Sequence, residues 1–244
     1  MSDAGALLFA RYAYPPNELG YCGPVGSCSL VASAPEEIAR RARGFEGAWA
    51  YLEFLASVAG LDDPLDPAVV SAYWVGGPLL AHASPEDLLT HLRPRFAGQP
   101  GGTWQEAGSR ALAHHSFHVF EVYPWAGLLR KTGNPAALSV LDRCRIRVGT
   151  VREVFESTAT VSCCPLVTSG DGRIVVGTPR DETVAWAAGG RSLLSGPAPG
   201  DRVALHWDWV CDVITEEQAG RIEALEARQL RASFPARESV VPPV

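Results

Sequence analysis

The sequence contains six cysteines and six histidines, the residue types best suited to nucleophilic chemistry and to binding soft metal ions. These residues are Cys22, Cys28, Cys144, Cys163, Cys164, Cys211, His82, His91, His114, His115, His118 and His206. No CxxC pair is present. In a reducing compartment, cysteines of this kind serve as free thiols, metal ligands or nucleophiles rather than as disulfides.

The first half offers two alternative sites. Cys22 lies in a turn-rich loop near a short expected helix, where a helix N-terminus would lower the pKa of its thiol. With His118 it could form the thiol-imidazolium pair of a cysteine-dependent hydrolase or transferase. Alternatively, Cys22, Cys28, His114 and His118 have the ligand types of a zinc or iron site. His114 and His118 are four residues apart, so a regular helix would place them on one face.

Composition limits the classes of protein. The chain has 244 residues, of which 47% are hydrophobic and 20% charged, as expected of a globular protein. A net charge of −6 argues against binding to nucleic acid, which needs clustered Lys and Arg. No apolar run is long enough for a membrane helix, and the first residues lack the pattern of a secretory signal. We therefore expect a cytoplasmic protein with no membrane contact.

Apolar residues at helical spacing predict that residues 1–142 form an all-α domain. A Pro- and Gly-rich loop is expected from Tyr14 to Gly26. Ser84, followed by a proline and two acidic residues, is typical of a helix N-cap. A further helix from about Trp104 is expected to carry the histidines near residue 115.

The pattern changes after residue 142. Short alternating runs between residues 145 and 206 predict about five strands, and so few strands favour a small OB-like β-barrel that protects its edges. A capping box from Thr215 to Gln218 predicts a final helix. We thus expect an α+β protein with a helical domain (1–142), a barrel plus terminal helix (143–232) and a disordered tail (233–244).

Two segments of the second half resemble the HypC/HupF family of hydrogenase-maturation chaperones. Residues 144–151 read C-R-I-R-V-G-T-V and resemble the family opening M-C-L-A-I-P-G-K-V, with the cysteine, glycine and last valine in register. Residues 200–219 read G-D-R-V-A-L-H-W-D-W-V-C-D-V-I-T-E-E-Q-A and are similar to the later motif G-D-Y-V-L-V-H-V-G-F-A-I with its acidic helix start. The resemblance covers about residues 143–232.

The resemblance implies a chaperone or metal-centre carrier without turnover. Family members are OB-like barrels that help assemble an iron carrying cyanide and carbon monoxide and deliver it to the large subunit of [NiFe] hydrogenase. It places the family's essential cysteine at Cys144 and its histidine at His206, which become the expected iron ligands. The expected partners are a hydrogenase large subunit or a maturation scaffold protein. This chain departs from the family in carrying its cysteine inside the chain, with Val148 in place of the family proline and Asp208 in place of the glycine after the histidine.

A third alternative remains open. The barrel could serve only as a protein-binding adaptor that has lost its metal. Cys211 and one of the adjacent pair Cys163 and Cys164 are expected to be buried packing residues.

Overall fold

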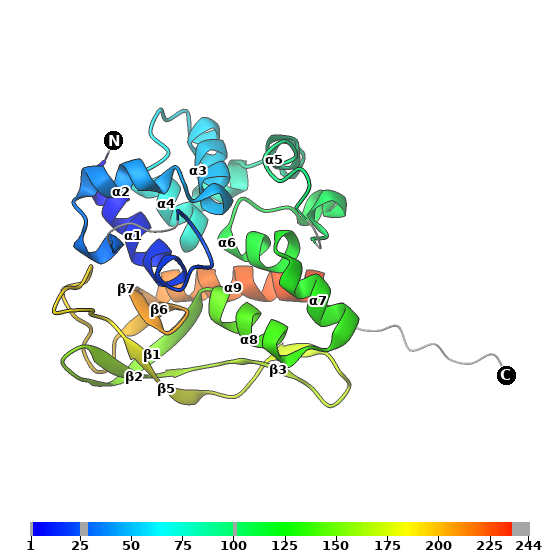
Figure 1. The fold of residues 1–244 in the computed structure, drawn as a ribbon. Coiled ribbons are helices and arrows are strands. Elements are labelled where there is room, and N and C mark those ends of the chain that lie inside the picture. Colours follow the sequence, from blue (N-terminus) through cyan, green and yellow to red (C-terminus); the bar gives the residue numbers. More distant parts are fainter. Residues whose placement is uncertain (1, 25–28, 100–101, 236–244) are drawn as a thin grey trace.

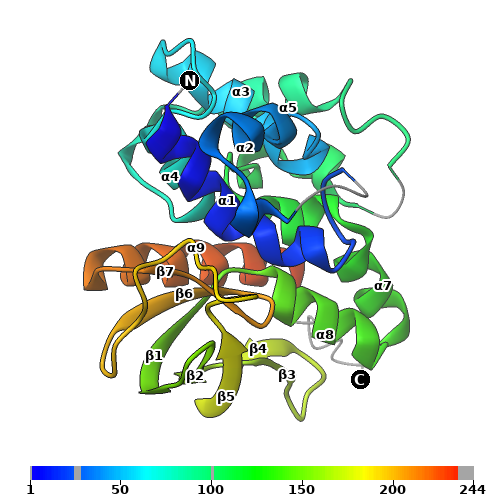
Figure 2. The ribbon, with the colours of Figure 1, turned by 60° about the vertical axis from the view of Figure 1, so that its left-hand side comes forward.

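The computed structural model describes residues 2–24, 29–99 and 102–235. Helices make up the first part of the chain, strands follow, and a long helix comes last, so the fold is α+β as expected. The helices form one layer and the strands lie below them, with the last helix running between the two (Figure 1). A view turned by 60° shows the same layering (Figure 2).

The helical part is formed by α1 (Asp3–Glu18), α2 (Pro35–Ala42), α3 (Glu46–Ala59), α4 (Pro67–Trp74), α5 (Pro85–Leu92), α6 (His115–Phe117), α7 (Pro124–Thr132) and α8 (Pro135–Cys144). Short 3-10 turns occur at η1 (Leu30–Ala32), η2 (Pro78–His82), η3 (Trp104–Glu106) and η4 (Gly108–Arg110). A π turn, η5 (His118–Val122), directly follows α6.

Two local predictions for this part have different outcomes. The Ser84 N-cap is confirmed, because its hydroxyl accepts a hydrogen bond from the Asp87 amide at 3.3 Å. The loop expected from Tyr14 is wrong at its start, because α1 continues to Glu18 through Pro15 and Pro16. Both prolines are buried, so packing maintains the helix although a proline cannot donate its backbone hydrogen bond.

The strands are β1 (Arg147–Val154), β2 (Thr158–Cys163), β3 (Leu166–Thr168), β4 (Ile174–Val176), β5 (Arg180–Ala185), β6 (Arg202–His206) and β7 (Trp209–Val213). Five of them pair in the closed order β1-β2-β5-β7-β6, and β6 pairs back to β1. The pairs are antiparallel except β5 with β7, which are parallel. The hairpin β3–β4 stands apart as a two-stranded sheet.

The final helix, α9 (Glu216–Ser233), begins at the predicted capping box. The Thr215 hydroxyl accepts from the Gln218 amide, and the Gln218 side chain accepts from the Thr215 amide. The helix continues through Ser233, one residue beyond the predicted end, and residues 236–244 of the predicted tail lie outside the described residues. No helix within the described ranges is long and apolar enough to cross a membrane.

The largest hydrophobic core is shared by the helices and the strands. It joins Phe9 and Trp74 of the helical part to Ile146, Trp209 and Ile222 of the second part. The division into two domains at residue 142 stays a prediction. The common core holds the helical layer against the strands, so side chains of the helices are positioned next to those of the strands.

Arg147 is a charged residue inside the strand layer. It is 1% exposed, and its guanidinium donates to Glu182 at 2.6 Å and to the Trp207 carbonyl oxygen at 2.7 Å. A buried ion pair of this kind is costly to break because the remaining partner keeps its charge without compensation.

We predict that Arg147→Ala lowers the free energy of unfolding by roughly 2–4 kcal/mol, since the Trp207 carbonyl oxygen loses its donor and Glu182 keeps only the exposed Arg180 as its cation. Urea denaturation measures this change. Arg152→Ala is the matched control on the same strand, because Arg152 is 57% exposed and its contact with Asp181 is long at 3.9 Å. That control should cost less than about 1 kcal/mol. Equal effects of the two substitutions would contradict the role assigned to Arg147.

A second buried ionisable residue, Glu226, lies on α9. Both carboxylate oxygens of Glu226 are buried and have no hydrogen-bond partner among the described residues. Burial raises the pKa of Glu226 to about 8, and the nearby charge of Arg145 only partly opposes this rise. Because the folded pKa exceeds the unfolded value, the unfolded chain ionises first and the protein loses stability as the pH rises from about 4.5 to about 8.

We therefore predict that Glu226→Gln stabilises the protein in a pH-dependent manner. The gain in unfolding free energy should be below about 1 kcal/mol at pH 5 and roughly 3–5 kcal/mol at pH 9. Urea titrations of both proteins at the two pH values test this difference. A gain that is the same at both pH values would show that the carboxyl group of Glu226 does not titrate as described.

Candidate functional site

Cys144 is the last residue of α8 and lies where the helical part joins β1. The helix begins at Asn134, whose side chain accepts a hydrogen bond from the Ala136 amide at 2.8 Å, and Pro135 occupies its first position. Such an N-cap and proline set the start of a helix. The ten-residue helix then ends with the Cys144 side chain buried, 2% exposed.

His206 is the last residue of β6 and is 1% exposed. It pairs with Trp209 across a two-residue turn whose first residue, Trp207, has a φ of 55°. The Trp207 amide donates to the carbonyl oxygen of Arg143 at 2.7 Å. This bond holds the end of β6 against the last turn of α8 and so brings His206 close to Cys144.

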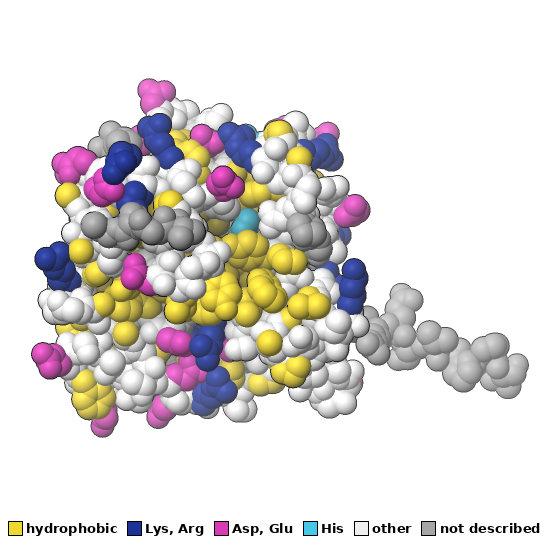
Figure 3. All heavy atoms as spheres, in the orientation of Figure 1, with side chains coloured by type: hydrophobic (Ala, Val, Ile, Leu, Met, Phe, Trp, Pro, Cys, Tyr) yellow, Lys and Arg dark blue, Asp and Glu magenta, His cyan; other side chains and the backbone are white. Residues whose placement is uncertain are grey.

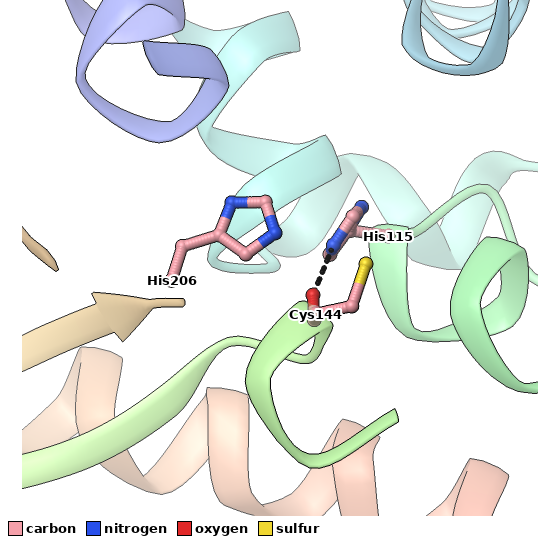
Figure 4. Close-up of side chains that lie close together, drawn as sticks. All are labelled: His115, Cys144 and His206. Atoms are coloured by element: carbon pink, nitrogen blue, oxygen red, sulfur yellow. Dashed lines mark hydrogen bonds between the residues drawn. The ribbon is translucent and has the colours of Figure 1, made fainter. Parts of the chain in front are cut away.

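A third residue, His115, joins them from the helical part. The ligand atoms of His115, Cys144 and His206 all lie within 4.8 Å of one another. Figure 4 shows the two rings and the sulfur facing a common space between α6, α8 and the end of β6. The structure therefore brings together the two residues selected from the sequence and adds a ligand that the sequence analysis did not select.

Hydrogen bonds to backbone carbonyls orient both rings. His206 donates from Nδ1 to the Tyr12 carbonyl oxygen at 2.7 Å, and its buried Nε2 has no hydrogen-bond partner among the described residues. His115 donates from Nε2 to the Cys144 carbonyl oxygen at 2.8 Å, and its Nδ1 lies 3.3 Å from the Tyr73 hydroxyl. Metal-binding histidines are held in the same way, because a hydrogen bond at one ring nitrogen fixes the tautomer that presents a lone pair on the other. At His206 this lone pair is on Nε2, whereas at His115 it is on Nδ1 and faces the Tyr73 hydroxyl.

The ring of Trp74 supports both imidazoles. Its centroid lies 4.6 Å from that of His115 and 5.7 Å from that of His206. The two imidazole centroids are 5.0 Å apart. Aromatic packing of this kind restricts the rings to a narrow range of positions.

Burial keeps the cluster uncharged. It lowers the pKa of His115 to about 4 and that of His206 well below its usual value. It also raises the pKa of the Cys144 thiol, and the charges of Cys22 and Glu226 add to this rise. At neutral pH the site consists of two neutral imidazoles and a protonated thiol, so Cys144 is a poor nucleophile on its own. A soft metal ion suits this donor set and would displace the thiol proton on binding.

A cavity of about 680 Å³ lies beside the cluster. His115 and His206 form part of its wall, and Cys22, His118 and Tyr123 form another part. A smaller cavity of about 370 Å³ is lined by Cys144 and Trp207, and it shares Tyr123 with the larger one. Diatomic or other small ligands of a bound metal therefore have space next to the donors.

Of the alternative site residues in the first half, Cys22 and His118 line this cavity. Cys22 contacts the Tyr123 hydroxyl at 2.7 Å, and the ring of Tyr123 packs on His118 with centroids 4.5 Å apart. Tyr123 thus contacts both Cys22 and His118, the two residues of the expected thiol-imidazolium pair. Burial raises the pKa of Cys22 and lowers that of His118 to about 3, which is the opposite of what such a pair requires.

Of the other two alternative ligands, His114 does not join the cluster. His114 is the N-cap of α6, and its Nδ1 accepts from the Ser116 amide at 3.1 Å. Cys28 lies outside the described residues. The regular helix expected around His114 and His118 is replaced by one α turn and a π turn, so their i,i+4 spacing does not define a common face.

Apolar side chains gather on the face of the molecule that shows α6, α7 and α8, and a histidine is visible beside them (Figure 3). Tyr21, 46% exposed, packs its ring on Trp207 with centroids 4.2 Å apart. Both rings line the smaller cavity, so the Cys144 side of the cluster is covered by aromatic groups near this apolar surface.

Fold and site together define an α+β protein with a buried His/Cys/His cluster at the junction of its helices and strands. Residues 1–238 match the family of unknown function DUF6390, and the chain belongs to that family. The match spans the helices, the strands and α9. No protein of curated function and no solved structure matches the chain.

We predict that the protein binds Co²⁺, used as a spectroscopic probe, with a sulfur-to-cobalt charge-transfer absorption from Cys144. Cys144→Ser should abolish this band because it removes the thiolate, and His115→Ala or His206→Ala should weaken binding at least about tenfold. Cys164→Ser is the matched control because Cys164 is a half-buried free thiol outside the cluster. A band that survives Cys144→Ser would place the metal elsewhere.

Proposed function

We propose that this protein is an accessory chaperone of [NiFe]-hydrogenase maturation that carries an iron bearing cyanide and carbon monoxide. The observation that carries the proposal is the convergence of Cys144 and His206, which lie far apart in the sequence. The resemblance to the HypC/HupF family selects the same two residues. The proposal is that of a carrier in the cytoplasm rather than of an enzyme.

The strand connections support the OB-like barrel in this proposal. If β5, β6 and β7 are counted as third, fourth and fifth strands, the pairing order becomes 1-2-3-5-4-1 with strands three and five parallel. This is the order of strands in an OB barrel. The hairpin β3–β4 is then an insertion between the second and third strands.

Each residue of the cluster has a distinct role in the proposal. Cys144 provides a soft thiolate for low-valent iron once its proton is displaced. His206 and His115 supply neutral nitrogens held by the carbonyl groups of Tyr12 and Cys144. The adjacent cavity of about 680 Å³ has room for the diatomic ligands of the cargo.

Delivery differs from that of the family because Cys144 is internal and buried. The exposed apolar side chains beside the smaller cavity suit a hydrogenase large subunit or a maturation scaffold as the docking partner. Tyr21 and Trp207 cover Cys144 on that side, so a partner that displaces these rings would reach the metal.

The proposal predicts that protein purified without oxygen from a hydrogenase-producing host contains stoichiometric iron and shows infrared bands of bound cyanide and carbon monoxide. Cys144→Ser and His206→Ala should lose both the iron and the bands because they remove first-coordination donors. The same substitutions should lower hydrogenase activity in that host, whereas Cys164→Ser should leave it unchanged.

Three results would contradict the proposal. These are protein without iron, infrared spectra without the bands, and hydrogenase activity unaffected by Cys144→Ser. Co-purification of a hydrogenase subunit in the absence of iron would instead support the adaptor, in which the barrel binds protein and carries no metal.

A further inference from the structure

A second cavity lies between the strands and α9, and its lining does not include His115, Cys144 or His206. Its volume is about 280 Å³. Its wall is mainly apolar and is formed by Phe120, Ile146, Val148, Leu166, Val176 and Leu230, among others. A small, largely apolar cavity with a few polar groups is the usual form of a small-molecule site.

Glu226 is one of the residues that line this cavity. The residue is 5% exposed, and both of its carboxylate oxygens are buried without a hydrogen-bond partner among the described residues. Buried carboxylates in folded proteins are normally paired or hydrogen-bonded, because an isolated one is costly. An unpartnered carboxyl group at the wall of a cavity therefore indicates that a ligand completes it.

The nearest cationic side chain does not compensate Glu226. Arg145 also lines the cavity, but its guanidinium donates to Asp142 Oδ1 at 3.0 Å and to the Cys164 carbonyl oxygen at 2.6 Å. The Asp142 carboxylate thus already balances the charge of Arg145. Glu226 is left as the acidic group of the cavity that lacks a cation.

We propose that this cavity binds a small primary amine with an apolar body, whose ammonium group donates hydrogen bonds to the Glu226 carboxylate. The ammonium group balances the carboxylate and offers three donors to its two oxygens. The apolar body of the ligand packs on the aliphatic wall, where burial of its surface adds affinity. A carboxylic acid is excluded by charge repulsion, and a neutral alcohol leaves the carboxylate uncompensated.

Glu223 provides an internal comparison. It lies three residues before Glu226 on α9 and also lines the cavity, but its side chain is 60% exposed and pairs with Arg202 at 3.3 Å. An exposed, screened carboxylate contributes little to binding of a cation. Substituting Glu226 and Glu223 in turn therefore distinguishes a specific contact with the amine from its general attraction to an acidic protein.

Titration of the full-length protein with benzylamine at about pH 8.5, followed by calorimetry and by NMR, tests the proposal, because Glu226 is mostly ionised at this pH and the amine is still cationic. Benzylamine should bind in a saturable manner at one site, and benzyl alcohol, of nearly the same shape, should bind at least about tenfold more weakly because it lacks the charge. Benzoate should not bind. Glu226→Gln should weaken benzylamine binding at least about tenfold, whereas Glu223→Gln should change it less than about twofold.

Ala227→Leu provides a second variant that keeps Glu226. Ala227 lines the cavity on a helix that accepts leucine well, so the larger side chain should fill the space and abolish binding without unfolding α9. The proposal is overturned if benzylamine does not saturate, if benzyl alcohol binds equally well, or if Glu226→Gln binds benzylamine as the unmodified protein does. These outcomes do not depend on whether Cys144 binds a metal.

Discussion

The hydrogen bond from the Trp207 amide to the Arg143 carbonyl oxygen fixes the relation between the helical part and the strands. It joins the turn after β6 to the last turn of α8, and each of these elements carries one candidate ligand at its end. His115 adds a second tie, because its ring donates to the carbonyl of Cys144 itself. Cys144 is therefore a candidate ligand through its sulfur and also orients His115 through its carbonyl oxygen. The cluster depends on both α8 and the turn after β6 being in place.

The sequence predicted the helices and strands better than the tertiary contacts between them. Capping at Ser84 and Thr215 and the change of period after residue 142 predicted the α+β order, because these signals depend on neighbouring residues. Cys144 and His206 were selected from motifs, and their convergence follows from strand pairing that no local pattern encodes. His115 was not selected as a ligand, because its approach depends on a three-residue helix and a π turn, which have no clear periodicity.

Burial makes the cluster unsuited to nucleophilic catalysis by Cys144. A catalytic thiol needs a neighbouring charge that stabilises its anion, whereas the rings near Cys144 are neutral and its thiol keeps its proton. A divalent metal supplies that missing positive charge when it binds. The same reasoning applies at Cys22, where the nearest polar group is the hydroxyl of Tyr123 rather than an imidazolium.

The origin of His115 has a consequence for how the two halves depend on each other. Of the three cluster residues, the strands supply His206, whereas the helices supply Cys144 and His115 together with the Tyr12 carbonyl that orients the His206 ring. The three-residue cluster is thus a property of the joined polypeptide, and the strands alone would present one of its side chains. In this chain, the helical layer holds two of the three candidate ligands against the end of β6.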